Sequence, residues 1–332
     1  MHKELHSVKL IRDYMEVKDI VKSKLEGIDD VFNFFNYLVS SEGSNKFNSL
    51  YILNYINQYI VDEEVAKRKT SARVFEDLLA IIFNGEVTDS KKRKNLNGDV
   101  PDYFKLTKDK IAGNKREKID LIFNDNYGIS LKTLMMNNKE INLGSFEKKV
   151  LFDGFDVSKY LTERKTEDEI GLGSIPRLTN LLNKIKEENN YEDFQERFSN
   201  MFNYIFADDM ILAIKDKGKL ELYFFKGKEF TNFVSSKVVD INLLVGIVNR
   251  WEGNSIRIDR TKLLESCSRK VVLDLSKLND TVIKLVNELD FKLHKSYIEY
   301  FNSNDNKEIK NNIISELEKL FDEFDTNIKK LK

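Results

Sequence analysis

The apolar positions in the first part of the chain recur with the period of amphipathic helices. In residues 17–39 and 47–61, apolar side chains follow one another at mixed spacings of three and four. Such spacing places them on one face of a helix. We therefore expect residues 1–65 to form a helical N-terminal region.

The same helical period continues in residues 70–85, TSARVFEDLLAIIFNG. Thr70 or Ser71 can cap the start of this helix, and Gly85 stands where a helix would end. The polar stretch that follows, residues 86–117, predicts a loop with some short structure.

The period changes to two in residues 118–134, KIDLIFNDNYGISLKTL, which predicts a β-hairpin. Side chains alternate between the two faces of a strand. Asp120 therefore points away from its apolar neighbours in the first strand, and Ser130 and Lys132 do so in the second. A carboxylate and an ammonium thus lie among residues that otherwise favour burial.

The pairing of the two strands depends on the turn between them. A turn at residues 125–127 would place Phe123 opposite Ile129 and Asp120 opposite Lys132. The pattern alone favours a cross-strand ion pair on a solvated sheet face, worth under ~1 kcal/mol.

The rest of the chain mixes helical and strand patterns. Residues 135–206 look mostly helical, with a break at glycines and Pro176. Residues 210–225 predict a second hairpin with its turn at residues 217–218, and the apolar stripe of residues 311–331 predicts a helix. The whole predicts an α/β fold with helices flanking a small mixed sheet.

Composition narrows the class of protein further. The chain has 332 residues, enough for one large domain or two ordinary ones, and its net charge is −1. Cys267 is the single cysteine, which excludes an intrachain disulfide and a cysteine-only metal site. The N-terminal segment lacks the apolar core of a signal peptide, and no apolar run approaches the ~20 residues that cross a bilayer. We expect a cytoplasmic protein.

The hairpin resembles the core of the PD-(D/E)XK nucleases, found in many type II restriction endonucleases. That core has an Asp in the first strand, a short turn and an acid-x-Lys motif in the second strand, and the helix before it usually carries a Glu, here Glu76. This sequence has Ser130 where the family usually has an acid, and a neutral hydroxyl can only position other groups. In a Ser-x-Lys branch of restriction enzymes the carboxylate moves to a later helix. Glu147, fifteen residues beyond Lys132, is one residue off that spacing. The resemblance covers residues 70–150.

The sequence also contains a literal Pro-Asp, at Pro101-Asp102 with Asp99 just before it. Gly98 and Pro101 are typical of an ordinary turn, where aspartate is expected for backbone reasons. A carboxylate inside an apolar strand needs more justification, so we favour Asp120 over Asp102.

The resemblance implies Mg²⁺-dependent hydrolysis of phosphodiester bonds, leaving 5′-phosphate and 3′-hydroxyl ends. Mg²⁺ takes oxygen ligands, usually one or two carboxylates together with waters and substrate phosphate. Asp120 would be the central ligand, and either Glu147 or Glu76 would be the second carboxylate. The carbonyl of Leu131 would be a third ligand, and Lys132 would orient or deprotonate the attacking water.

Two basic segments are candidate DNA contacts. The first is the run at residues 90–95, with Lys91, Lys92 and Lys94. The second carries Arg257, Arg260, Arg269 and Lys270. Arginine and lysine suit phosphate contacts, and arginine also suits guanine contacts. The alternatives are a solvated turn in the first segment, and a surface strand with ion pairs to Asp259 and Glu265 in the second.

The sequence thus predicts a type II restriction enzyme that acts on double-stranded DNA as a homodimer. Residues 66–235 would form the restriction-endonuclease-like catalytic core, and residues 236–332 a mixed, then helical, region for DNA recognition or dimerisation. Two alternatives remain: a non-enzymatic helical scaffold that binds DNA or protein, and a repair nuclease with the same core.

Overall fold

A computed structural model describes residues 3–67, 70–88, 118–124, 126–145, 151–152, 175–252, 255–278, 280–303 and 306–331. Its helices are α1 (Lys3–Val17), α2 (Ile28–Val39), α3 (Phe47–Ile56), α4 (Glu63–Ala66), α5 (Thr70–Ile82), α10 (Ile175–Glu187), α11 (Tyr191–Ile205), α12 (Glu229–Lys237), α13 (Ile241–Ile247), α14 (Arg260–Glu265), α15 (Asp280–Asn302) and α16 (Lys307–Leu331). Its strands are β1 (Glu86–Val87), β2 (Leu121–Phe123), β3 (Tyr127–Met135), β4 (Glu140–Ser145), β5 (Asp209–Asp216), β6 (Lys219–Phe225), β7 (Val248–Glu252), β8 (Ser255–Asp259) and β9 (Arg269–Asp274).

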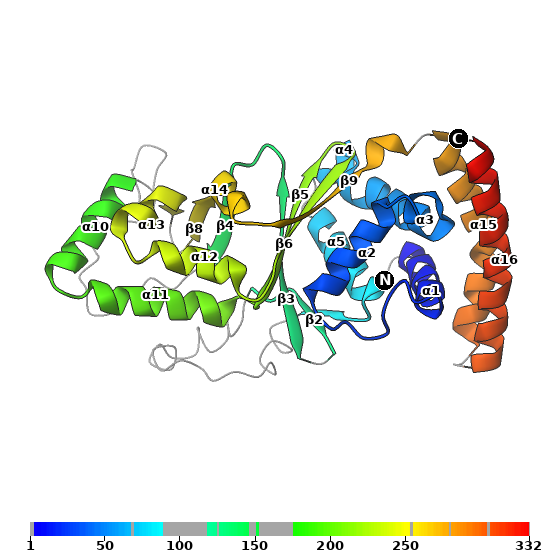
Figure 1. Cartoon of the computed structure of the whole chain (residues 1–332), viewed down its shortest axis with the longest axis horizontal. Helices are drawn as coiled ribbons and strands as arrows, with labels where there is room; N and C mark the ends of the chain where they lie inside the picture. Colours follow the sequence, from blue (N-terminus) through cyan, green and yellow to red (C-terminus); the bar gives the residue numbers. More distant parts are fainter. Residues whose placement is uncertain are drawn as a thin grey trace.

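A six-stranded mixed sheet forms the centre of the molecule, in the order β1-β2-β3-β5-β6-β9 (Figure 1). Strands β1, β2 and β3 are antiparallel neighbours, whereas β5 runs parallel to β3. A parallel pair needs a crossover, and here the chain passes through α10 and α11 between β3 and β5. The predicted mixed sheet flanked by helices is confirmed.

Each face of the central sheet carries its own hydrophobic core (Figure 1). Helices α1–α5, α15 and α16 cover one face, where Leu131 and Ile211 are buried. Helices α10–α13 and the second sheet cover the other face, where Met210 and Leu212 are buried. The N-terminal and C-terminal helices therefore share one core, and the C-terminal region also supplies strand β9 to the sheet.

The second sheet has three antiparallel strands, in the order β4-β8-β7. Its strand β4 falls inside residues 135–206, so the helical prediction is wrong there. Ile141 and Leu143 are fully buried and alternate with an exposed Asn142, which is the period of a strand rather than of a helix. The helical pattern of α10 and α11 holds for the later residues.

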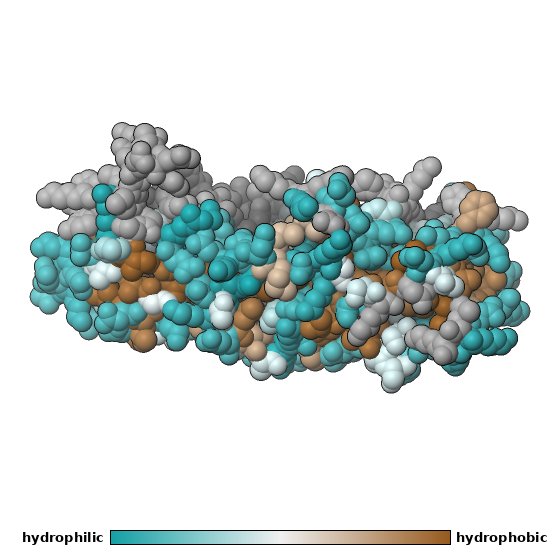
Figure 2. Space-filling view, turned by 90° about the horizontal axis from the view of Figure 1, so that it is seen from above, coloured by the Kyte–Doolittle hydropathy of each residue, from teal (hydrophilic) through white to brown (hydrophobic). Residues whose placement is uncertain are grey.

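Other predicted elements match the structure. The first hairpin and helix α5 form where the pattern placed them, and β5 and β6 make the second hairpin, with Gly218 at a φ of 65° in its turn. Helix α16 buries the expected stripe, including Leu317, Phe321 and Ile328. In the described part of the chain, no helix combines the length and apolarity that a membrane crossing needs. Hydrophilic residues cover much of the described surface seen in Figure 2, with hydrophobic patches between them.

The register of the first hairpin differs from the prediction by two residues. Leu121 pairs with Ile129 and Phe123 with Tyr127, so the turn begins one residue earlier, at Asn124. Asn124 has a φ of 49°, a left-handed conformation that asparagine tolerates better than most residues. Its side-chain amide also donates to the carbonyl of Leu25, which fixes the turn against the segment before α2.

The shift changes the partner of the candidate aspartate. Continuing the observed register places Asp120 level with Ser130, so the predicted pairing with Lys132 is wrong. Because the shift is two residues, the alternation of faces is unchanged. Asp120, Ser130 and Lys132 still point away from the face that buries Ile129 and Leu131.

The end of α5 is fixed closely against β2. The N–H of Gly85 donates to the carbonyl of Ala80 at 2.7 Å, which closes the helix where the sequence predicted its end. A Cβ at Gly85 would lie 2.2 Å from Cδ1 of Phe123 and 2.8 Å from the carbonyl oxygen of Ile122. The absence of a side chain therefore lets α5, which carries Glu76, lie directly beside the hairpin.

Candidate active site

Backbone contacts hold Asp120 between two strands. Its N–H donates to the carbonyl of Ile129 at 3.1 Å, and its own carbonyl accepts from the N–H of Thr88 at 2.9 Å. Its carboxylate accepts from the N–H of Leu131 at 2.7 Å. The side chain is only partly buried. The result is a carboxylate with a fixed position and access to solvent, directly before the start of β2.

Leu131 thus contributes its N–H to this site. The sequence predicted its carbonyl as a metal ligand; the described contacts of Leu131 give instead a hydrogen bond that holds Asp120. The N–H therefore fixes the orientation of the Asp120 carboxylate.

Glu76 lies on α5 with its side chain 21% exposed. Burial raises its pKa from 4.5 to about 7, and repulsion by the carboxylate of Asp120 acts in the same direction. The charges of Arg73 and Lys132 lower the pKa and offset part of this rise. Asp120 and Lys132 are therefore each close enough to Glu76 to act on it electrostatically, although the three residues come from three elements.

Arg73 is a member of this group that sequence reasoning missed. Its guanidinium Nη1 lies 3.4 Å from Oε2 of Glu76, one helical turn later. The signal was present as an i,i+3 spacing of opposite charges. Its side chain is 57% exposed, and its positive charge lowers the pKa of Glu76.

Ser130 has a role in the fold. Its side chain is fully buried, and its Oγ accepts a hydrogen bond of 2.9 Å from the N–H of Ala207. Ala207 belongs to the segment that leads into β5. Ser130 therefore ties β3 to the segment that leads into its parallel neighbour β5.

The described residues provide two carboxylates, Glu76 and Asp120, for a cation. Among the residues that the structure describes, no cluster of three or more His, Cys, Asp and Glu side chains could hold a metal. Two carboxylates suit Mg²⁺, which commonly keeps several waters and needs few protein ligands. Other predicted site residues lie outside the described part of the chain: Glu147, Asp99, Asp102, Lys91, Lys92 and Lys94.

The arginines of the predicted DNA-binding strand make intramolecular contacts. Nη1 of Arg257 lies 3.4 Å from Oε2 of Glu140, on the neighbouring strand β4. Nη1 of Arg260 donates to the carbonyls of Met136 and Asn138, at 2.7 Å each. These contacts join β8 to β4, and the start of α14 to the turn after β3. Glu140, which the sequence did not suggest, is thus a partner of Arg257.

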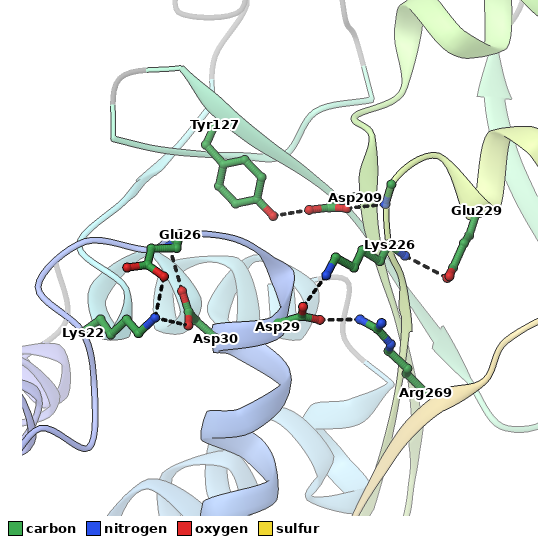
Figure 3. Close-up of polar contacts among 10 residues, drawn as sticks. Lys22, Glu26, Asp29, Asp30, Tyr127, Asp209, Lys226, Glu229 and Arg269 are labelled. Carbon is green, nitrogen blue, oxygen red and sulfur yellow. Dashed lines mark hydrogen bonds and ion pairs between the residues drawn. The ribbon is translucent and has the colours of Figure 1, made fainter.

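Arg269 and Lys270 on β9 are also paired. Arg269 forms an ion pair with Asp29 at the start of α2, and Lys226 pairs with the same carboxylate (Figure 3). The ammonium of Lys270 lies 2.9 Å from Oε2 of Glu221. These cations therefore join β9 to a helix and to β6, and much of their charge is compensated within the chain.

A pocket of about 500 Å³ lies beside this ion-pair cluster, at the starts of β3 and β5. Asp209 accepts there from the hydroxyl of Tyr127 and from the N–H of Gly227, the latter at 2.7 Å (Figure 3). Its described lining carries five carboxylates: Glu26, Asp29, Asp30, Asp208 and Asp209. Ion pairs with Lys22, Lys226 and Lys228 compensate part of this negative charge.

Comparisons of the chain with family models, with curated proteins and with solved structures found no match.

Proposed function

We propose that the protein is a cytoplasmic Mg²⁺-dependent endodeoxyribonuclease, a type II restriction enzyme, with Glu76, Asp120 and Lys132 in its active site. The observation that carries the proposal is the position of Glu76, a largely buried carboxylate on α5 that lies within electrostatic reach of both Asp120 and Lys132. They come from α5, the start of the hairpin and β3. If Asp120 and Lys132 formed only an ordinary ion pair on a solvated sheet face, a second carboxylate such as Glu76 would not be needed beside them.

The topology supports the proposal as well. The chain forms a helix, three antiparallel strands, further helices and then a strand parallel to the third, namely α5, β1–β3, α10–α11 and β5. The glutamate on the helix and the Asp and Ser-x-Lys positions on the hairpin occupy the places on which the resemblance to the PD-(D/E)XK nucleases rests. A restriction-endonuclease-like core made of these elements is part of the proposal.

Two carboxylates, Asp120 and Glu76, would hold Mg²⁺, with Glu147 as a further candidate. When bound, Mg²⁺ lowers the pKa of a coordinated water and neutralises charge on the reacting phosphate. Mutual repulsion makes the two carboxylates receptive to a cation, because a positive charge between them removes the repulsion. A proton on Glu76 competes with the cation below a pH of about 7.

The ammonium of Lys132 would orient the attacking water and stabilise the developing negative charge on the phosphate. Asp120 keeps its position through the N–H of Leu131, and Ser130 keeps β3 aligned with β5. The products would carry 5′-phosphate ends.

The proposed substrate is double-stranded DNA, bound by a homodimer whose two-fold symmetry matches that of a palindromic site. The four basic residues of the second segment, Arg257, Arg260, Arg269 and Lys270, already hold the fold together. The lysines of residues 90–95 are therefore the favoured phosphate contacts in this proposal.

The test is the incubation of purified protein with plasmid DNA, in Mg²⁺ and in EDTA. Discrete bands in Mg²⁺ alone are the expected result, and Lys132→Met should lose them, while Lys184→Met on the exposed side of α10 should not. No cleavage in Mg²⁺, or unchanged cleavage by Lys132→Met, would refute the proposal. A continuous smear would favour a repair nuclease instead.

A further inference from the structure

A buried lysine, Lys215, lies on β5 and is not one of the three residues of the proposed active site. Only 4% of the residue is exposed. Its ammonium donates to the carbonyl of Ala66 at 2.9 Å and to Oγ of Ser71, where α4 meets α5. Burial lowers its pKa. Both acceptors are neutral, and an ammonium has three N–H donors, so its charge has no direct compensation in these two contacts.

This ammonium borders a cavity of about 620 Å³ between β3 and the first turn of α5. The cavity lining includes Lys67, Ala72, Thr133 and two asparagines. Among the described residues that line it there are two lysines and no carboxylate. The pocket beside Asp209, of similar size, differs in that its described lining includes five carboxylates.

Helix α5 adds to the positive potential of the cavity. The helix has 13 residues, and Ala72, in its first turn, is a lining residue. The N-terminus of a helix carries a partial positive charge and N–H groups without partners in the helix. A buried ammonium, a second lysine and a helix start therefore favour the same kind of ligand, an anion with several acceptor oxygens.

We propose that this cavity is a binding site for a phosphate group, with Lys215 as its principal charged contact. The third N–H of the ammonium, the amide groups of Asn137 and Asn138 and the hydroxyl of Thr133 are the further donors that the lining offers. The proposal does not depend on the nuclease activity. The alternative is that Lys215 has only a structural role, in which its ammonium binds the carbonyl of Ala66 at the end of α4. The experiment must distinguish this role from phosphate binding.

The phosphate could belong to a nucleic-acid backbone or to a small molecule. Thr133 follows Lys132 in β3, and Ala72 precedes Glu76 by one turn of α5. The cavity is therefore adjacent to the proposed active site, and a backbone phosphate bound there would be a different one from the phosphate that is cut.

The test is calorimetric titration of the full chain with inorganic phosphate, at constant ionic strength in sodium chloride. Lys215→Met should weaken binding at least tenfold. Because that variant also loses the contacts to Ala66 and Ser71, a second variant, Ala72→Asp, keeps them and brings a carboxylate into the cavity. It should fold normally, since acidic residues suit the first turn of a helix, and weaken phosphate binding equally.

Thr70→Asp is the matched control, because it adds the same charge to the same helix end at an exposed position outside the lining. It should change phosphate affinity no more than about threefold. Absence of phosphate binding by the wild type, or equal binding by wild type and Ala72→Asp, would overturn the proposal.

Competition with a short DNA duplex in EDTA distinguishes a phosphate of the nucleic-acid backbone from the phosphate of a small molecule. If a backbone phosphate occupies the cavity, the duplex displaces inorganic phosphate, and Ala72→Asp lowers the dependence of log affinity on log salt by about 0.9. If the ligand is a small molecule, phosphate binds and the duplex does not compete. Both results support the site.

Discussion

Glu76→Gln tests the electrostatics of the proposed active site directly. Glutamine keeps the shape of the side chain but is neutral at every pH. The pKa of Glu76 rises from 4.5 to about 7 on folding, because of burial and then of repulsion by Asp120. Between these values the folded protein holds a proton that the unfolded chain releases. The free energy of unfolding of the wild type therefore decreases as the pH rises through this window. Above pH 7 the decrease is complete and stays constant.

The size of the decrease follows from the pKa difference. The rise is about 2.5 in pKa, which at 1.36 kcal/mol for each is about 3 kcal/mol. The side chain is 21% exposed, so we take this as the upper end and expect ~1–3 kcal/mol. The Gln variant should thus match the wild type well below pH 4.5 and exceed its stability above pH 7.

Urea unfolding in EDTA, followed at several pH values, measures the difference in free energy of unfolding. Glu187→Gln on α10, whose side chain is 70% exposed, is the matched control and should change stability by less than ~0.5 kcal/mol throughout. A difference between Glu76→Gln and wild type that does not vary with pH would refute the reasoning. Adding Mg²⁺ above pH 7 should restore stability to the wild type and have less effect on the variant.

Three further predictions concern the fold and DNA binding. Gly85→Ala should destabilise the protein by ~1–3 kcal/mol in urea unfolding, because its Cβ would overlap Phe123. Ser130→Ala should cost ~1–3 kcal/mol in the same assay, since the N–H of Ala207 loses its buried acceptor. Neutralising the lysines of residues 90–95 should flatten the dependence of DNA affinity on salt and weaken all sequences alike, which duplex binding across a salt series measures.

The sequence predicted the hairpin and helix α5 because local periodicity and a terminal glycine determine them. The register was wrong because either of two three-residue turns fits NDNYG. The turn that forms uses a left-handed Asn124, whose amide contacts Leu25, almost a hundred residues away in the chain. A contact so distant in sequence leaves no local pattern.

In the candidate site, too, local patterns were predicted correctly, whereas features that depend on contacts distant in the sequence were missed. Alternation in the strands predicted that Asp120 and Lys132 face one side, and the resemblance added Glu76. The role of Lys215 was not visible, because a lysine near a hairpin turn has the pattern of a solvated residue. Its burial depends on the corner between α4 and α5, which packs over the end of β5.

The most direct test of the central claim, that Asp120 and Lys132 act in one active site, is a double-mutant comparison of cleavage. Initial rates of plasmid cleavage in Mg²⁺ are measured for wild type, Asp120→Asn, Lys132→Met and the double variant. Residues that act as a unit are not additive. We predict that each single change slows cleavage by several orders of magnitude and that the double variant is no slower than either. Wild-type rates in either single variant, or losses that multiply in the double variant, would contradict the account.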